Sequence, residues 1–337
     1  MRSVSSSTSQ DQSLGGAPVR RLNSLAFARP GPTAFDSTRK RWEPPNLVDA
    51  ETMLRLGFVG VVFLSDAYGT EPLRAHTLRG KGAKPARMVA KAAVLCGGRG
   101  ERLRPLTDFF QKTMIPVGAK RRPLLEYIIR LLVYHNVREI VLLTGYKADE
   151  IERYFEDGSK FGARLTYSQD AKQMGGSANA VANALLAKKL GDCDTLVVYY
   201  GDIISDLNVT DLVRRHHSLR VDATLVLDNR YTLPVGVAKV KNGRVASFEE
   251  KPSYEMSVTT GNMVIGGSGQ ELIVRMSRER RKNDLMTDFI PRLLKTRGRV
   301  GAYYTKGFWH DIGTVASYEQ LNQERVDEKL RFLERNP

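Results

Sequence analysis

The sequence predicts an α/β protein with a mainly parallel sheet, and two observations carry this prediction. Short apolar runs rich in Val, Ile, Leu and Tyr alternate with segments of helical periodicity. The helical segments are long enough to cross back over a sheet, as parallel neighbouring strands require. In chain order the predicted strands are 92–96, 139–143, 164–168, 195–200 and 223–227, and the predicted helices are 124–135, 149–155, 178–190 and 209–217.

A smaller β-rich segment follows these alternating elements. Predicted strands 237–240 and 245–249 flank Asn242-Gly243, a dipeptide preferred in tight hairpin turns. A further strand is expected at 259–265, and an amphipathic helix at about 315–333. We therefore expect a mixed, mainly parallel central sheet with a small β subregion.

Residues 1–87 differ in composition from residues 88–337, which form the predicted domain. They are rich in Ser, Gly and Pro, hold 13 Lys or Arg against 7 Asp or Glu, and show little periodicity outside 47–68, which suits a short helix or strand. Such a composition buries too little apolar surface to offset the entropy of ordering. Three interpretations stay open: a disordered tail, an organellar transit peptide, or a start assigned too far upstream. Met88, just before the first strand, slightly favours the last.

Bulk properties restrict the partners. The net charge of +15 suits nucleic acid, or anionic substrates together with a basic extension. The basic residues are scattered without interleaved aromatics, so we expect no nucleic-acid partner. The longest apolar stretch, 54–64, is shorter than the ~20 residues that cross a bilayer, so we expect no membrane span. Cys96 and Cys193 have no metal-ligand spacing, which indicates a reducing, cytoplasmic location. Homo-oligomerisation stays open.

The first strand leads into a glycine-rich loop, Gly97-Gly98-Arg99-Gly100. A strand that ends in such a loop exposes backbone N–H groups to phosphate oxygens, and glycines allow close approach. Arg102, Arg104 and Lys112 add three cations just beyond it. The loop lacks a third glycine and a G-K-[ST] ending, so it is neither a dinucleotide fingerprint nor a P-loop. The pattern predicts a triphosphate site of another kind.

Residues 97–107 (GGRGERLRPLT) and 111–117 (QKTMIPV) resemble the signature of the sugar-1-phosphate nucleotidyltransferases. This family, also called nucleotide-sugar pyrophosphorylases, includes mannose-1-phosphate guanylyltransferases and glucose-1-phosphate thymidylyltransferases. The first stretch fits A-G-G-x-G-x-R-L-x-P-L-T with Cys96 in place of Ala; the second keeps Lys112 but replaces both prolines around it. The resemblance covers about residues 90–325. It implies a Rossmann-like nucleotidyltransferase fold and the reaction of a nucleoside triphosphate with a sugar-1-phosphate, giving NDP-sugar and pyrophosphate.

The resemblance implies four catalytic residues. Arg102 and Lys112 would act on the triphosphate and at the reacting centre, and Arg104 is assigned a structural role. Asp202, after the strand 195–200, and Asp311, in the W-x-D-I-G-T match, would be the two Mg²⁺ ligands. Chemistry agrees, because ligands of open α/β sheets bind at the carboxyl ends of strands and Mg²⁺ takes oxygen ligands.

The nucleotide would contact three loop residues and a base-reading segment. The loop residues are Leu95, Gly97 and Gly98, and the segment supplies Asp170, Gly175 and Gly176. A carboxylate only accepts hydrogen bonds. Guanine offers it two adjacent donors, whereas uracil and thymine offer one donor between two carbonyls. Asp170 therefore favours GTP over dTTP or UTP.

The sugar would contact the segment after the hairpin. Glu250-Lys251-Pro252 matches the family's E-K-P, so Lys251 would face the sugar phosphate and Glu250 a sugar hydroxyl. Gly236 would lie against the sugar, and Thr259 and Asn262 depart from the family's I-N-A-G, which makes the pocket atypical. The identity of the sugar stays open.

Two alternatives remain. One is a thymidylyl-, uridylyl- or cytidylyltransferase of the same fold, and the other is a nucleotide-sensing regulatory member without turnover. His216 and His217 fall on a predicted helix, where we interpret them as packing or surface residues rather than ligands.

Overall fold

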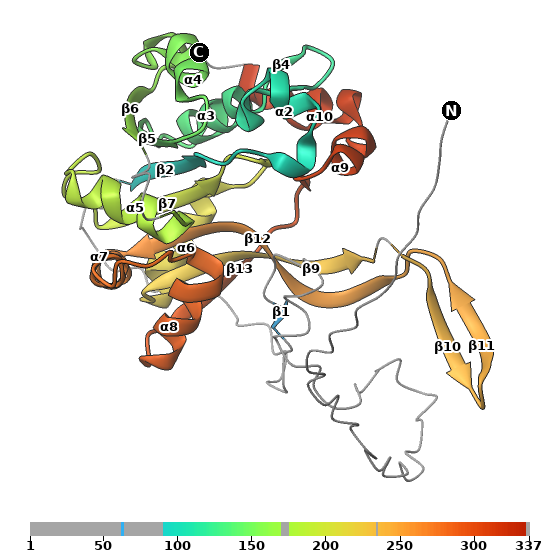
Figure 1. Cartoon of the computed structure of the whole chain (residues 1–337). Helices are drawn as coiled ribbons and strands as arrows, with labels where there is room; N and C mark the ends of the chain where they lie inside the picture. Colours follow the sequence, from blue (N-terminus) through green and yellow to red (C-terminus); the bar gives the residue numbers. More distant parts are fainter. Residues whose placement is uncertain (1–61, 64–89, 170–174, 234, 335–337) are drawn as a thin grey trace, which may run out of the picture. The chain divides into compact units, whose positions relative to one another are not determined.

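The computed structural model describes residues 62–63, 90–169, 175–233 and 235–334; Asp170 lies outside them. Its core is an eight-stranded sheet with the order β13-β9-β12-β7-β2-β5-β6, and β1 pairs with β12 (Figure 1). The strands are β1 Val62–Phe63, β2 Ala90–Cys96, β5 Glu139–Thr144, β6 Arg164–Gln169, β7 Thr195–Tyr200, β9 Ala223–Thr232, β12 Ser253–Gly266 and β13 Val300–Tyr304.

The sheet is mixed and mainly parallel, as predicted. β12 runs antiparallel to β1, β7 and β9. The pairs β13-β9, β7-β2, β2-β5 and β5-β6 are parallel. β1 lies within residues 1–87, so these two residues join the sheet at Ser257 and Val258.

Helices cover both faces of this sheet. Successive residues of a strand point to opposite faces, so Ala92 and Val94 of β2 join one core cluster and Ala93 the other. The first cluster includes side chains of α3 Leu124–Tyr134, α4 Ala148–Phe155 and α6 Val209–Leu219. The second includes side chains of α5 Ser177–Leu186, α7 Gly267–Ser277 and α8 Ile290–Lys295. Among the described residues no helix is long and apolar enough to cross a membrane.

Two sequence predictions about helices are wrong. The single helix expected at 315–333 is divided into α9 Val315–Gln320, α10 Gln323–Lys329 and a 3₁₀ turn Arg331–Glu334. Leu321 has extended backbone, and the Asn322 side chain accepts a hydrogen bond from Arg325 N, which starts a new helix. α5 ends at Leu186, not at 190.

Short elements complete the fold. They are the 3₁₀ turns Glu101–Leu103, Lys112–Met114 and Ser159–Phe161, the helical turn α2 Leu106–Phe109, the π-helical turn η4 Leu285–Phe289, and the strand pairs β3 Pro116–Val117 with β4 Arg122–Pro123 and β8 Ile203–Ser205 with β14 Trp309–Asp311.

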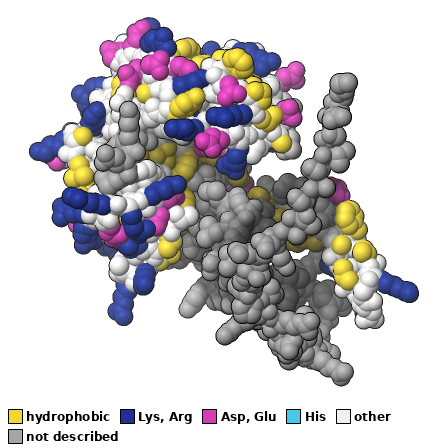
Figure 2. Space-filling model, viewed as in Figure 1, with side chains coloured by type: hydrophobic (Ala, Val, Ile, Leu, Met, Phe, Trp, Pro, Cys, Tyr) yellow, Lys and Arg dark blue, Asp and Glu magenta, His cyan; other side chains and the backbone are white. Residues whose placement is uncertain are grey.

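The predicted hairpin is present and projects from the ends of β9 and β12 (Figure 1). It consists of β10 Val237–Lys241 and β11 Arg244–Glu249. Asn242 and Gly243 both have positive φ, 49° and 74°, as a type I′ turn requires. Figure 2 shows hydrophobic side chains along this hairpin, where Val240, Val245 and Phe248 are about two-thirds exposed.

Candidate active site

The candidate site lies at the carboxyl ends of β2 and β7. From β2 the chain continues to β5 and β6 on one side, while β7 pairs with β2 on the other. This reversal of strand order is where open α/β sheets bind ligands. Gly201 N donates to Leu95 O at 3.1 Å, which places the two loops side by side. A Cβ at Gly201 would lie 2.5 Å from that oxygen, so this approach requires glycine.

The glycine-rich loop is supported on one side and open at Gly98. Tyr146 N donates to Gly97 O at 3.2 Å, and the Thr107 hydroxyl donates to Gly100 O at 2.9 Å. Gly100 itself has a φ of 64°. In contrast, a Cβ at Gly98 would meet no described atom within 4 Å. Space for a ligand therefore remains against the backbone of Gly98.

Lys112 is fixed by Gln111, which stands where the family signature has a proline. Gln111 is fully buried, and its Nε2 donates to Cys96 O at 2.5 Å. Its Oε1 accepts from the backbone N and the hydroxyl of Thr113, at 2.6 and 2.7 Å. The carboxamide thus ties the loop to the end of β2, and Lys112 Nζ lies 2.5 Å from Asp202 Oδ2.

Strand pairing brings the two predicted metal ligands together. β14 pairs with β8 so that Asp311 lies opposite Ile203, and Ile312 N donates to Asp202 O at 2.8 Å. Asp311 remains accessible to solvent. The surrounding protein and the negative charge of Asp202 raise the pKa of its carboxyl group, while Lys112 and Arg102 oppose that shift. The structure therefore brings together Lys112, Asp202 and Asp311, and it places Arg102 near enough for its charge to act on the Asp311 carboxyl group.

Arg104 lies outside this group. Its guanidinium contacts Asp108 at 3.3 Å in an exposed pair along the chain. The role of Arg104 stays a prediction. Trp309 supports the Asp311 strand from the other side, because its indole N–H donates to Asp228 Oδ2 at 2.6 Å.

The base-reading segment is described only from Gly175 onwards. Gly175 is exposed, and Gly176 has a φ of 113° immediately before α5. A Cβ at Gly176 would lie 2.2 Å from Asn283 O, which excludes any larger residue there. Sequence reasoning missed Asn283, since nothing in the local pattern links it to a distant loop.

Gly236, Glu250 and Lys251 lie at the base of the hairpin, whereas Thr259 lies further along β12, opposite Leu227 of β9. Carboxylate oxygen Oε2 of Glu250 lies against Gly236, where a Cβ would be 2.7 Å away. Lys251 is exposed with a φ of 49°, and the Thr259 hydroxyl accepts from Gly261 N at 3.1 Å. Across the described ranges, no hydrogen bond or ion pair joins this group to Asp202 or Asp311.

Asn262, the second departure from the family's I-N-A-G, is buried between two strands. Its side chain is 2% exposed, and its Oδ1 accepts from Tyr200 N at 2.9 Å. It therefore connects β12 to β7 just before Asp202. The expectation of an atypical sugar pocket stays a prediction.

The fold, with a glycine-rich loop beside Asp202 and Asp311, is the one expected of the nucleotidyltransferase class. Comparison with known proteins agrees. The Nucleotidyl transferase family matches residues 91–328, so the chain belongs to this family. It is 30% identical over 72% of its length to a UTP–glucose-1-phosphate uridylyltransferase of Synechocystis sp.. It is also 30% identical over 71% of its length to a glucose-1-phosphate thymidylyltransferase of Streptomyces antibioticus. These matches span 65% and 67% of the relatives' own lengths.

Solved structures share the fold. A putative glucose-1-phosphate thymidylyltransferase from Bacillus anthracis, in complex with sucrose, matches with a TM-score of 0.55 and 25% identity. The match covers 72% of this chain and 95% of that one. HddC from Yersinia pseudotuberculosis, complexed with GMP-PN, matches with a TM-score of 0.53, 22% identity, and coverage of 69% and 97%. The predicted family and fold are confirmed.

Proposed function

We propose that the protein transfers a nucleotidyl group from a nucleoside triphosphate to a sugar-1-phosphate, releasing pyrophosphate. The observation that carries this proposal is the convergence of Lys112, Asp202 and Asp311 beside an open glycine-rich loop. Joining two anions requires positive charge at the triphosphate and an aligned attacking oxygen. Arg102 and Lys112 supply that charge, and Gly97 and Gly98 let the phosphates approach the backbone.

The residues present fit a bound Mg²⁺. Asp202 and Asp311 are close enough for the charge of one to raise the pKa of the other, a repulsion that a divalent cation relieves. The described residues hold no cluster of three or more ligating side chains. Two carboxylates suit Mg²⁺, which keeps waters and takes substrate phosphate oxygens for the remaining positions. When bound, the ion would neutralise charge that develops on the phosphates.

GTP is the nucleotide we propose, with a pyrimidine triphosphate or ATP as its competitor. The support for GTP is the acceptor-only carboxylate of Asp170, which lies outside the described residues. The competitors are supported by relatives named uridylyl-, thymidylyl-, cytidylyl- and adenylyltransferases. The same reasoning leaves the sugar open, with Lys251 and Glu250 as its proposed contacts.

The remaining proposals concern location and partners. Cys96 and Cys193 have no metal-ligand spacing, which supports the reducing cytoplasm as the location we propose. Lys and Arg side chains are interspersed with Asp and Glu on the face in Figure 2, which supports small anionic substrates over nucleic acid.

The test is pyrophosphate release with Mg²⁺ across ATP, CTP, GTP, UTP and dTTP, each with several sugar-1-phosphates. We expect turnover with one nucleotide–sugar pair and its loss in Asp202→Asn. Turnover with UTP or dTTP in place of GTP would discard the Asp170 argument and keep the reaction. Nucleotide binding without turnover for every pair would instead indicate the regulatory, nucleotide-sensing alternative.

A further inference from the structure

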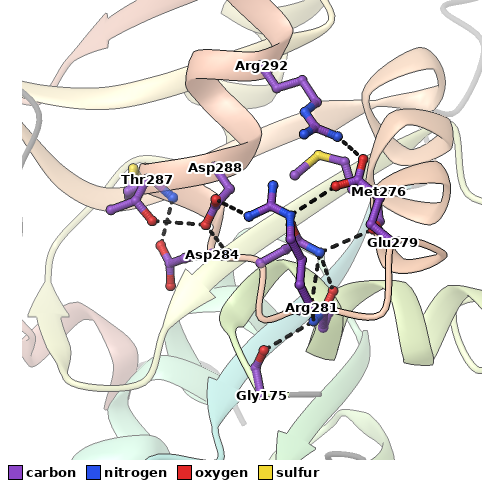
Figure 3. Close-up of polar contacts among 11 residues, drawn as sticks. Gly175, Met276, Glu279, Arg281, Asp284, Thr287, Asp288 and Arg292 are labelled. Atoms are coloured by element: carbon purple, nitrogen blue, oxygen red, sulfur yellow. Dashed lines mark hydrogen bonds and ion pairs between the residues drawn. The ribbon is translucent and has the colours of Figure 1, made fainter.

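A polar network spans the loop between α7 and α8 and reaches Gly175 (Figure 3). At its outer end Arg281 contacts Glu279 at 3.0 Å and Asp288 at 3.1 Å, and Arg292 also contacts Glu279. Exposed ion pairs of this kind stabilise little individually. The inner end differs, because there side chains bond to backbone next to the candidate nucleotide site.

Asp284 uses both carboxylate oxygens at this inner end. Oδ1 accepts from Met286 N at 2.9 Å and caps the turn η4. Oδ2 accepts from the Ser177 hydroxyl at 2.7 Å. The same hydroxyl accepts from Leu285 N at 2.9 Å, so Ser177 is held both as donor and as acceptor. Bonds to a charged acceptor are stronger than neutral ones.

Neighbouring bonds fix the turn before Ser177. Asn179 Nδ2 donates to Gly175 O at 3.1 Å and to Arg281 O at 2.8 Å. Ala178 N donates to Asn283 O at 3.1 Å, the oxygen against which Gly176 packs. Hydrogen bonds through Asn179 and Ala178 therefore connect the Gly175–Gly176 turn to the 281–285 loop, and we call this set of bonds the clamp.

The clamp adjoins the strand that carries the reacting centre. Tyr200, two residues before Asp202, has its hydroxyl buried next to Ser177 and Asp284. The Ser177–Asp284 pair therefore lies beside the end of β7 that leads to Asp202.

We propose that Asp284 is a positioning residue for the nucleotide, acting through Ser177 on the Gly175–Gly176 turn. This inference rests on the proposed function, which assigns Gly175 and Gly176 to nucleotide binding. Asp284 itself does not touch the substrate. Its role is to hold the turn in the single conformation that accepts the base of a nucleoside triphosphate.

The test compares two variants with a matched control. One variant removes the hydroxyl group of Ser177, the other removes the charge of Asp284, and both nearly preserve the size of the side chain. Ser177→Ala removes the donor of the Ser177–Asp284 bond, and Asp284→Asn removes the negative charge of its acceptor. Thr287→Val removes an exposed hydroxyl that donates to Asp288 at 3.1 Å in the same network but does not contact Ser177. For each protein we would measure Mg²⁺-dependent binding of ATP, CTP, GTP, UTP and dTTP, KM for both substrates, and thermal unfolding.

We expect Ser177→Ala and Asp284→Asn each to weaken nucleotide binding about tenfold, with the KM for sugar-1-phosphate within about twofold. The double variant should be little worse than either single one, because both act on the same bond. Thr287→Val should bind like the wild type.

Equal losses for nucleotide and sugar, or losses that Thr287→Val reproduces, would overturn the inference and leave the reaction standing. Binding that weakens as expected in a protein without turnover would keep the inference and reject the proposed reaction. A wild-type protein that binds none of the five nucleotides would reject both.

Discussion

Asp202 and Asp311 are held together by a backbone hydrogen bond from Ile312 N to Asp202 O, 2.8 Å long, at the end of the β8–β14 pair. The separation of the two carboxylates is therefore set by strand register and not by flexible side chains alone. We therefore expect insertions or deletions in β8 or β14 to disrupt the site, because a register shift of one residue turns the Asp311 side chain to the opposite face.

Replacement of Asp311 by Asn should abolish most turnover while the fold is retained. The carboxylate is accessible and its pKa is raised by its surroundings, so the neutral amide should not destabilise the protein. We expect pyrophosphate release to fall by about 10²–10³-fold or more. Asp149→Asn is the control, because Asp149 is exposed and forms an ion pair with Arg153 on its own helix. Equal rates in both variants would remove Asp311 from the site.

Gln111→Ala should lower both stability and kcat. It leaves Cys96 O and Thr113 N without their present partners, at a cost of about 2–3 kcal/mol in the free energy of unfolding. Gln270→Ala is the matched control, since Gln270 is also buried and donates to Cys193 O and Ile265 O. Urea unfolding should show similar losses for both, whereas kcat should fall only for Gln111→Ala. A comparable fall in kcat for Gln270→Ala would attribute the effect to instability.

Gly98→Ala should leave stability unchanged and raise the KM for the nucleotide. A Cβ at Gly98 meets no described atom within 4 Å, so a methyl group there can clash only with a ligand. Gly267→Ala is an equally open position on α7 and should change neither quantity. Melting temperatures check the stability of both variants, and initial rates at varied nucleotide concentration give the KM. An unchanged nucleotide KM in Gly98→Ala would place the phosphates elsewhere.

His216 should make the protein less stable as the pH falls below about 6.5. Burial, followed by the neighbouring His217, lowers the pKa of His216 to about 4. An unfolded histidine titrates near 6.5, so between these values the unfolded chain binds more protons and the free energy of unfolding decreases with falling pH. The decrease is about 1.4 kcal/mol per pH unit at most. The slope levels off below pH 4.

Urea unfolding between pH 7 and 4 measures that slope. His216→Gln removes the titrating group and should flatten it. His217→Gln, on the same helix α6, should retain most of it. An unchanged slope in His216→Gln would assign the pH dependence to other groups.

Sequence alone predicted the strands whose apolar residues are continuous, and the loop at the end of β2. Apolar runs and glycine-rich loops are patterns of neighbouring residues, so they can be recognised in one amino-acid sequence. It did not predict α7, α8 or β13. α7 holds Gly267 and Gly269, and α8 has Pro291 in its first turn, so their helical patterns are short and weak. Packing in the second core cluster stabilises them instead.

The candidate site divides in the same way. Arg102, Lys112, Asp202 and Asp311 were predicted from motifs. Strand pairing brings the two aspartates together, and the Lys112 side chain reaches Asp202 from a separate loop. The hydrogen bond from Gln111 to Cys96 O depends on the tertiary structure, which decides which backbone oxygen lies within reach of the side chain. It could therefore not be predicted from the sequence. The Ser177–Asp284 bond joins residues far apart in the chain, and no periodicity records such a contact.

β12 connects the two halves of the site in one continuous strand. Residues 263–266 are bonded to β7, and residues 253–255 continue towards Lys251. The register with β9 is interrupted between Glu255 and Val258 and again between Thr259 and Met263. A paired ladder resists bending, so any approach of Glu250 and Lys251 to the carboxylates must be absorbed at those two interruptions. On the proposed sugar role of Glu250 and Lys251, the stiffness of β12 would set how far sugar and nucleotide can be drawn together, and the second interruption, beside Thr259, is the one nearer β7.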